Sequence, residues 1–518
     1  MSHAMRFWFR VPVRSLCAFA LLSVLVLSHA SLAGPASPPS CPRATGPEWL
    51  RVTSTHFHIR TSLDEDSARR AARELERLRD ALRSLWGPAF DPLGHVDVIL
   101  LRERELAEFT GQQVGQQVGG FHAEDANDVP LMALGVQGER FEELVDRSTL
   151  AHELAHHLTR FLFRRDSRWV SEGLAAFLET VRMGEGPAGT VLGYPHPGHL
   201  KHLRAHGCLP VEELWRWDER PALEDPGLHD FYASSWLWVH YLFGMHRERL
   251  TRFEQALYDA REPHQAWEEA FGDAGDLEKG LQEYVRGNVY QATSFAAPPE
   301  PPPARVEKLP HAEVHAVRAQ LWLRSPGGMA WEERLRRARP EVQQALSEDV
   351  TNVAAVVLRS GMARDEAERL ALARALVKAR PDAGEGWSLL GRALQATKAP
   401  LPEQEEAFRK AVALLPDSAS AQGDLARHYI FRGLPEKALE PATRTWLLAP
   451  SSALSLEVYA ISALQLGYCT DGLRTLRQTL SVVSAKASTR PELLRSLGDR
   501  LTRYEHACDE AKRSTPAK

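Results

Sequence analysis

The sequence has few cysteines, and no two of them stand at the spacing of a cysteine-based metal or redox site. Five cysteines occur among 518 residues and none forms a C-x-x-C motif, so we expect neither a zinc ribbon nor a thiol redox centre. A surplus of basic charge is also missing, because 63 Lys and Arg stand against 68 Asp and Glu, for a net charge of -5. We therefore expect no nucleic-acid partner.

Long apolar runs are missing after the N-terminal segment, so a second membrane-crossing stretch is not expected. Residues 1–33 contain three early arginines, an apolar run from Leu16 to Leu27 and the small-x-small pattern Ser31-Leu32-Ala33, which together predict a secretory signal peptide. The run is shorter than the roughly 20 residues that span a bilayer. We expect export to the periplasm or the extracellular space of a bacterial envelope. An uncleaved signal that anchors the chain in the membrane stays the alternative.

Four cysteines remain after the predicted signal peptide, and an oxidising compartment would allow them to form two disulfides. They are Cys41, Cys208, Cys469 and Cys508. Cys469 and Cys508 are the favoured pair because both belong to the last predicted domain. The sequence does not fix the connectivity, so other pairings stay open.

The chain length predicts two or three domains. Residues 34–46 are rich in proline and small residues and predict a disordered leader. The proline-rich run inside 296–304 favours extended polyproline conformation and predicts a semi-rigid linker. We therefore divide the mature chain into a first domain at 47–295 and a helical domain at 305–518.

The first domain alternates strand and helix patterns. An alternating segment from Trp49 onward and the apolar segment 95–101 predict strands. Residues 65–86 and 141–163 have helical spacing of apolar residues, and a further helix is expected near Ser171. The order predicts an α+β fold, a small mixed sheet followed by a helical region.

The last domain repeats with a period near 34 residues. Similar segments begin at Pro381, Pro416 and Pro450, at intervals of 35 and 34 residues. Ten residues after each proline stands a small residue, Gly391, Ala426 or Ala460, that would allow close helix contact. This all-α pattern resembles tetratricopeptide (TPR-like) repeats, whose stacked helix pairs form a curved surface for protein partners. A non-repetitive helical bundle is the alternative.

The segment HELAH, His152 to His156, carries the strongest chemical signal. Two histidines four residues apart on a helix share one face, so both imidazoles can reach one metal ion. Glu153 could accept a proton from a zinc-activated water and later protonate the leaving amine. Leu150, Leu154 and Leu158 form an apolar stripe that would seat this helix.

Zinc needs a third protein ligand, and Glu172 is the candidate. Sixteen residues separate it from His156, enough for one helix to end and a second to return. Ser171 could cap the second helix, and Gly173 would permit close approach of the two helices.

The segment HELAH followed by W-x-x-E-G-x-A-x-x-x-E resembles the gluzincin zinc metallopeptidases, in particular bacterial peptidase MA-like domains with a minimal thermolysin-like core. The resemblance covers about residues 47–290. It implies that one zinc ion is held by His152, His156 and Glu172, with Glu153 as general base and acid. A weaker match at 231–242 implies that Tyr232 stabilises the oxyanion, although an ordinary packing role stays open.

Several neighbouring residues have two interpretations. His157 is expected to be a surface residue or an indirect partner of the site, and not a ligand. Glu179 could orient a ligand histidine or form a surface ion pair. The segment Gly119-Gly120-Phe121 forms either a substrate-binding edge strand or a hairpin turn. The histidines that follow Pro195 are expected to be solvent-exposed in a loop: His196, His199, His202 and His206.

The predicted function is a secreted zinc peptidase whose repeat domain docks a protein partner or substrate. Its expected cofactor is one Zn²⁺, and its expected substrate is a peptide or protein. The alternative is a non-catalytic envelope scaffold, in which the repeats bind partners and the metal domain is structural. A zinc hydrolase acting on a non-peptide amide also stays open.

Overall fold

The computed structural model describes residues 48–514 with short gaps. The gaps are 88–89, 111–119, 125–129, 137–146, 185–188, 220–226, 273, 289, 326–328 and 486–490. The predicted signal peptide and disordered leader lie outside the described residues and stay predictions. So does the first part of the helix expected at 141–163.

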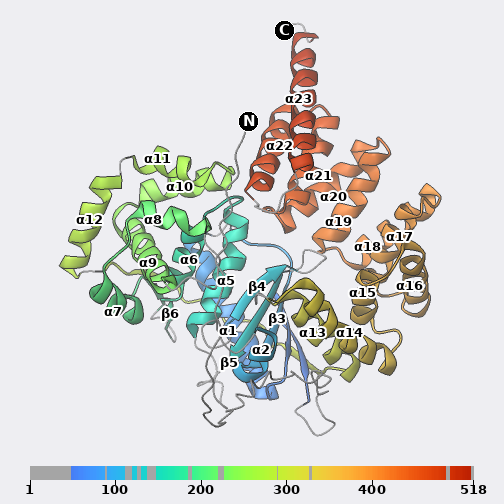
Figure 1. The fold of residues 1–518 in the computed structure, drawn as a ribbon, viewed down its shortest axis with the longest axis horizontal. Coiled ribbons are helices and arrows are strands. Elements are labelled where there is room, and N and C mark those ends of the chain that lie inside the picture. The colour runs from blue at the N-terminus through green and yellow to red at the C-terminus, as the bar shows by residue number, and fades with distance from the viewer. Residues whose placement is uncertain are drawn as a thin grey trace, which may run out of the picture. The chain divides into compact units, whose positions relative to one another are not determined.

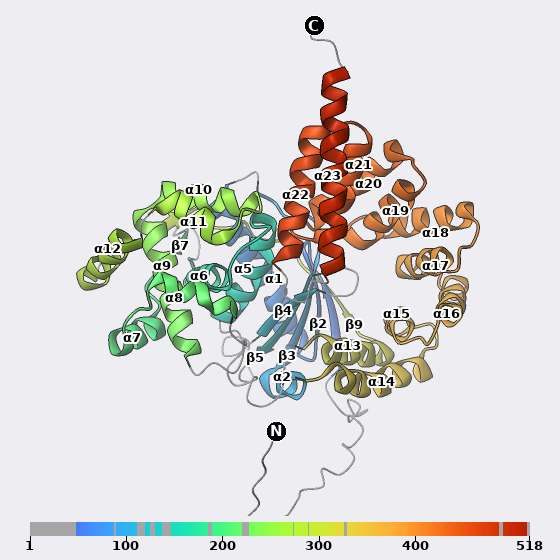
Figure 2. The same ribbon diagram turned by 45° about the horizontal axis from the view of Figure 1, so that its top comes forward.

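The first folded region is built on a six-stranded mixed sheet with the order β4-β5-β3-β2-β1-β9 (Figures 1 and 2). β2, β3 and β5 run parallel to one another, whereas β1, β4 and β9 pair antiparallel with their neighbours. The small mixed sheet predicted from the sequence is therefore present. Its strands are β1 (Leu50–Thr53), β2 (Phe57–Thr61), β3 (Val96–Arg102), β4 (Gly120–Glu124), β5 (Pro130–Val136) and β9 (Arg305–Lys308).

Helix α1 (Glu65–Arg83) packs on one face of this sheet. Val52 and Ile59 stand opposite each other on β1 and β2 and are fully buried on that face, because paired residues of neighbouring strands point to the same side of a sheet. The N-cap residue of α1 is Asp64, whose carboxylate accepts a hydrogen bond from the backbone N–H of Ser67 at 2.9 Å. Its predicted apolar face is buried: Ala68, Ala72, Leu75, Leu78 and Leu82.

The opposite face of the sheet is covered by α2 (Glu103–Thr110) and α13 (His311–Arg324). Ile99 and Leu101 of β3 pack there in one core cluster with Trp322 of α13. Both helices are therefore part of the folded region built on the sheet, although α13 follows the proline-rich segment.

The boundary predicted at 296–304 does not match the packing of the residues that follow it. Strand β9 adds to the edge of the sheet, with Val306 opposite Val52 in register. The sheet region therefore continues through α13 and does not stop at residue 295. A four-residue strand carries too little alternation to reveal a partner so distant in the chain.

The helical part of the first region carries the fully buried Trp169, Trp217, Trp236, Trp238 and Trp267. A small antiparallel sheet, β6-β7-β8, also lies here and was not predicted. Its strands are β6 (Arg182–Met183), β7 (Thr190–Leu192) and β8 (Thr293–Phe295). The helices are α5 (Arg147–Leu162), α6 (Arg168–Leu178), α7 (Pro197–His206), α8 (Val211–Trp215), α9 (Leu228–Met245), α10 (Arg247–Tyr258), α11 (Pro263–Phe271) and α12 (Ala274–Gly287).

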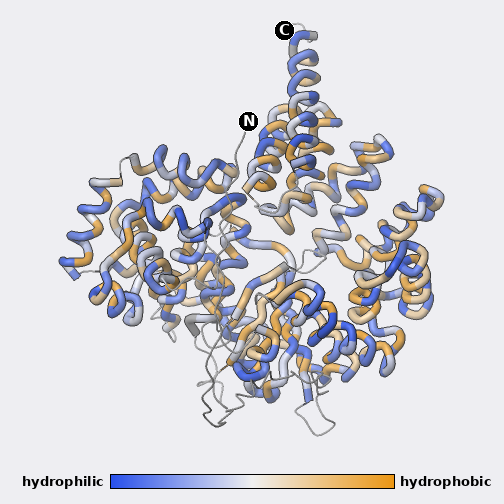
Figure 3. The backbone as a smooth tube through the Cα atoms, in the orientation of Figure 1, coloured by the Kyte–Doolittle hydropathy of each residue, from blue (hydrophilic) through white to orange (hydrophobic). Residues whose placement is uncertain are grey.

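The C-terminal region is helical and repeat-like, as the sequence predicts. Hydrophobic and hydrophilic residues alternate along its helices (Figure 3). An added Cβ at Gly391 would lie 2.5 Å from a ring carbon of Phe408, so the small residue there permits close helix packing. The helices are α14 (Trp331–Glu348), α15 (Val353–Gly361), α16 (Glu366–Ala379), α17 (Gly384–Ala396), α18 (Leu401–Leu414), α19 (Ala419–Phe431), α20 (Pro435–Leu448), α21 (Ala453–Gln465), α22 (Cys469–Ser484) and α23 (Pro491–Ser514).

A disulfide joins Cys469 at the start of α22 to Cys508 in α23, which confirms the favoured pairing. Cys208 is a free, exposed thiol among the described residues, and Cys41 lies outside them. Within the described ranges, no helix combines the length and apolar character needed to cross a membrane.

Candidate metal centre

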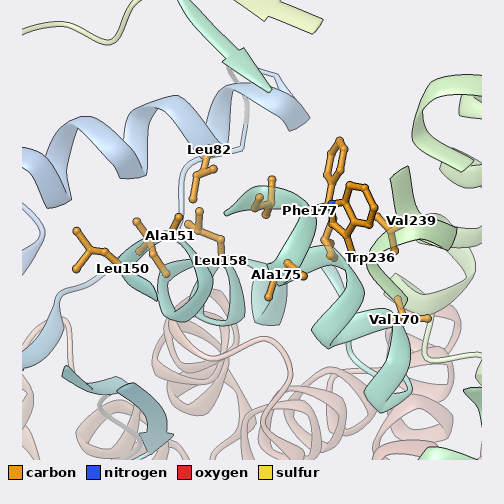
Figure 4. Close-up of a cluster of buried hydrophobic side chains, with 14 of the residues drawn as sticks. Leu82, Leu150, Ala151, Leu158, Val170, Ala175, Phe177, Trp236 and Val239 are labelled. Atoms are coloured by element: carbon orange, nitrogen blue, oxygen red, sulfur yellow. The ribbon is translucent and has the colours of Figure 1, made fainter. Parts of the chain in front are cut away.

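Helix α5 positions the HELAH segment by burying its apolar stripe. Leu150, Leu154 and Leu158 are at most 5% exposed and belong to the main core. Figure 4 shows Leu150 and Leu158 among side chains from α1, α6 and α9. With this stripe buried, the rotation of α5 about its axis is fixed, and so is the direction in which its two histidines point.

The two imidazoles of α5 converge on one point. Nε2 of His152 lies 3.1 Å from Nε2 of His156, and the ring centroids are 4.7 Å apart with planes at 78°. The close pair of nitrogens needs a proton or a cation between them, because two lone pairs would otherwise repel.

Glu172 completes the group from helix α6. Its Oε2 lies 3.2 Å from Nε2 of His152 and 3.5 Å from Nε2 of His156. This oxygen is buried and makes no hydrogen bond within the described residues, so a cation would satisfy it. Burial raises the pKa of Glu172, but the two imidazoles outweigh it and hold the pKa well below its usual value. The three ligand atoms lie within 4.8 Å of one another, as a metal site requires.

Glu179 and Ser171 orient the two histidines through their other nitrogens. Oε1 of Glu179 lies 2.5 Å from Nδ1 of His152, and Oγ of Ser171 lies 3.2 Å from Nδ1 of His156. Each ring thus turns Nε2 toward Glu172. Of the two interpretations of Glu179, the structure favours orientation of the histidine.

The cap predicted at Ser171 is wrong. Helix α6 begins earlier, with Ser167 at its N-cap position, and Ser171 lies inside the helix. Gly173 also has a different neighbour from the expected one, because an added Cβ would lie 2.6 Å from the carbonyl oxygen of Ser235 in α9. Gly173 therefore permits close packing of α6 on α9. Ser235 is fully buried.

Glu153 is buried beside the edge strand β4. It is 6% exposed, and burial raises its pKa above the usual value while His152 and His156 oppose the rise. An added Cβ at Gly120 would lie 3.2 Å from Cγ of Glu153. Of the two interpretations of Gly120, the structure therefore shows the edge strand, which contacts the HELAH helix.

Tyr232 comes from helix α9 and lies within electrostatic reach of the group. Burial, together with the negative charges of Glu172 and Glu153, raises the pKa of its phenol well above the usual value. The ring also packs edge-on against Trp217, with centroids 5.1 Å apart. Both predicted roles, the phenol donor and the packing residue, fit these contacts.

His152 and His156 have a buried neighbour in His157. It is 4% exposed, so the surface interpretation is wrong. Its ring lies 6.2 Å from that of His122 and 5.4 Å from that of Phe161. Burial lowers the pKa of His157 to about 3, so this ring is neutral.

The histidines after Pro195 belong to a helix and its N-cap, although a loop was expected. His206 is exposed, as expected, whereas His196 and His202 are half-buried and His199 is buried. Pro197 opens helix α7, and Nδ1 of His196 accepts a hydrogen bond from the backbone N–H of His199 at 3.1 Å. Nε2 of His196 lies 3.5 Å from Oε2 of Glu179. His199 is 9% exposed and stacks on His196. Proline at the first helical position was the signal that sequence reasoning missed.

The comparisons with known proteins give two findings. A family model described as "Protein of unknown function (DUF1570)" matches residues 146–263. This stretch contains the predicted metal ligands and catalytic residues, which are His152, Glu153, His156, Glu172 and Tyr232. Among solved structures, one titled "Crystal structure of MamA protein" is similar at 16% identity, covering 34% of this chain and 93% of that chain with a TM-score of 0.26; we draw nothing from a likeness at that score. The comparison with curated proteins gives no match.

Proposed function

We propose that this protein is a zinc-dependent peptidase of the gluzincin type, with a minimal thermolysin-like core. The observation that carries the proposal is the convergence of His152, His156 and Glu172 within 4.8 Å. Two imidazoles and one carboxylate are the ligand set of catalytic zinc sites that keep a position open for substrate.

The residues present fit a zinc ion by their chemistry. Glu172 has a buried oxygen that makes no hydrogen bond in the described part of the chain. The Nδ1 atoms of His152 and His156 lie within hydrogen-bond distance of Glu179 and Ser171, which leaves both Nε2 atoms for a metal. Zinc, when bound, acts as a Lewis acid that polarises a carbonyl and makes water a competent nucleophile near neutral pH.

Glu153 moves the protons in this proposal. It accepts a proton from the attacking water and delivers it to the leaving amine. Burial raises its pKa, which brings the carboxylate closer to the basicity that such a role needs at neutral pH.

Tyr232 acts as a hydrogen-bond donor to the oxyanion. The raised pKa of its phenol keeps the O–H protonated at any pH where the enzyme works. A neutral donor at this place stabilises the charge that grows on the carbonyl oxygen during attack.

Strand β4 binds the substrate backbone. It is the end strand of the six-stranded sheet as described, and Gly120 brings it against Glu153. An extended peptide that pairs with such an edge gains main-chain hydrogen bonds regardless of its sequence.

The repeat-like C-terminal region docks a protein partner or the protein substrate. Stacked helix pairs offer an extended surface for this purpose. We further propose that the protein is exported to the periplasm or beyond the cell, and the disulfide between Cys469 and Cys508 supports an oxidising compartment.

The test combines zinc analysis with digestion of a peptide library by wild type and Glu153→Gln. We expect both proteins to hold zinc at the site formed by His152, His156 and Glu172, and only the wild type to cleave peptides. Glu283→Gln, an exposed substitution on α12, is the matched control and should cleave normally. Retained zinc with no cleavage by any of the three proteins would support the scaffold alternative.

A further inference from the structure

A second pair of histidines lies four residues apart on another helix. His311 and His315 stand on α13, and Glu348 reaches them from the end of α14. Nδ1 of His311 lies 2.8 Å from Oε2 of Glu348, and Nε2 of His315 lies 3.7 Å from its Oε1. The three ligand atoms lie within 4.8 Å of one another.

The geometry of this group parallels that of the first. The imidazole centroids of His311 and His315 are 4.9 Å apart with planes at 83°, against 4.7 Å and 78° for His152 and His156. In both groups the carboxylate comes from the helix that follows the two histidines in the chain: Glu172 on α6 and Glu348 on α14.

A buried carboxylate orients one histidine here, as in the first group. Oε2 of Glu341 lies 2.5 Å from Nδ1 of His315, and both side chains are 2% exposed. Arg318 holds the other oxygen of Glu341 at 2.6 Å and also pairs with Glu108. This network directs Nε2 of His315 toward Glu348, in the way that carboxylates orient metal-binding histidines.

The arrangement around His315 leaves one nitrogen for a cation. Nδ1 of His315 is engaged by Glu341, so Nε2 is the nitrogen that faces Glu348. A divalent ion placed among Nε2 of His315, His311 and Glu348 would have three ligand atoms within reach. An ion pair between His315 and its carboxylate neighbours, with no metal, is the competing interpretation.

We propose that His311, His315 and Glu348 bind a second divalent cation, and that the cation is zinc. Imidazole and carboxylate together suit zinc better than magnesium or calcium, which take oxygen ligands. The ion fastens α14 to α13, the helix that covers the second face of the sheet. Its role is structural, because the residue after His311 is Ala312, whereas Glu153 follows His152.

The test is a zinc count on four forms of the purified full protein. Each form is stripped with a chelator, reloaded with zinc, passed through a desalting column and analysed for zinc per chain. We expect two equivalents for wild type, one for His311→Ala, one for His152→Ala and none for the double variant. His311 is about half exposed, so its replacement should leave the fold intact.

A matched control separates loss of a ligand from loss of a neighbour. Gln344 donates a hydrogen bond to Oε1 of Glu348 at 2.9 Å but offers no ligand of its own, so Gln344→Ala should keep both equivalents. Glu348→Ala should lose one.

The outcomes separate this inference from the proposed peptidase. One equivalent in wild type that persists in His311→Ala and disappears in His152→Ala overturns the second site and leaves His315 with its carboxylate neighbours alone. One equivalent that persists in His152→Ala and disappears in His311→Ala supports the second site and counts against the first.

Discussion

The two histidine pairs share their spacing and ring geometry but differ in their surroundings. One pair is His152 and His156 on α5, and the other is His311 and His315 on α13. Glu153 follows the first histidine of one pair, and Ala312 follows that of the other. The first site adjoins the edge strand β4, whereas the second joins two helices and leaves His311 about half exposed. The neighbours of the ligands, more than the ligands, distinguish the chemistry that we propose for the two sites.

The largest effect on peptide cleavage is expected from replacing Glu153, because the second site has no glutamate at the equivalent position. Glu153→Gln should lower peptide cleavage by about 100-fold to 10,000-fold, the range for a general acid–base group, because the amide cannot accept a proton. Steady-state cleavage of a fluorogenic peptide measures it, with zinc content as the control. Activity within a few-fold of wild type would remove Glu153 from the mechanism.

The carboxylates that orient a histidine, Glu179 at the first site and Glu341 at the second, allow a direct comparison of the two sites. Glu179→Ala should weaken zinc binding at the first site and Glu341→Ala at the second, each by about 10-fold to 100-fold, because each orients a histidine through Nδ1. Competition with a chromophoric chelator measures both affinities in the His311→Ala and His152→Ala backgrounds. A Glu341→Ala variant with unchanged affinity would separate the sites and show that only Glu179 has this role.

A smaller effect is expected from the packing of β4 on the first site. In Gly120→Ala the added Cβ would lie 2.6 Å from Leu134 and 3.2 Å from Glu153, so the strand or the carboxylate must shift. Displacements of about 1 Å can cost up to roughly 100-fold in rate, so we expect kcat to fall while zinc content holds. Gly498→Ala has open space around its Cβ and should change neither quantity. Unchanged kcat in Gly120→Ala would show that β4 does not position Glu153.

The smallest effect concerns pH and the first site. Burial lowers the pKa of His152, but Glu172 and Glu179 outweigh it and raise the pKa well above its usual value in the metal-free protein. This raised pKa stabilises the metal-free fold fully below the unfolded pKa near 6.5, and that stabilisation disappears as the pH rises through the folded pKa. Zinc must displace the proton below that folded pKa.

The rise in Tm on adding zinc to His311→Ala should therefore grow between pH 6 and pH 8. Differential scanning fluorimetry at fixed zinc concentration measures it. A rise that shrinks with increasing pH would contradict the proton competition at His152.

The sequence predicted the parts of the structure that depend on local spacing. The apolar stripe of α5 and the small residues of the repeats follow from helical periodicity, and the mixed sheet follows from alternation. Glu172 was found because the distance from His156 suits two consecutive helices. The convergence of His152, His156 and Glu172 was therefore predictable as far as one helix pair can specify it.

What the sequence did not reveal depends on partners far apart in the chain. Strand β9 pairs with β1, although the rest of the first folded region lies between them in the sequence. Four residues are too few to show from the sequence alone which strand β9 pairs with. The sequence suggests a cap at Ser171 and does not show its contact with His156, which depends on how α5 and α6 cross. The sequence also does not reveal the second histidine pair as a group, since its carboxylate, Glu348, lies on α14, and only the fold brings α14 back against α13.

The most direct test of the central claim is an anomalous-scattering map at the zinc edge, from crystals of the zinc-loaded protein. We expect one peak bounded by Nε2 of His152, Nε2 of His156 and a carboxylate oxygen of Glu172, and a second between His311, His315 and Glu348. Ordered side chains at the first site with no peak among them would contradict the zinc peptidase that we propose.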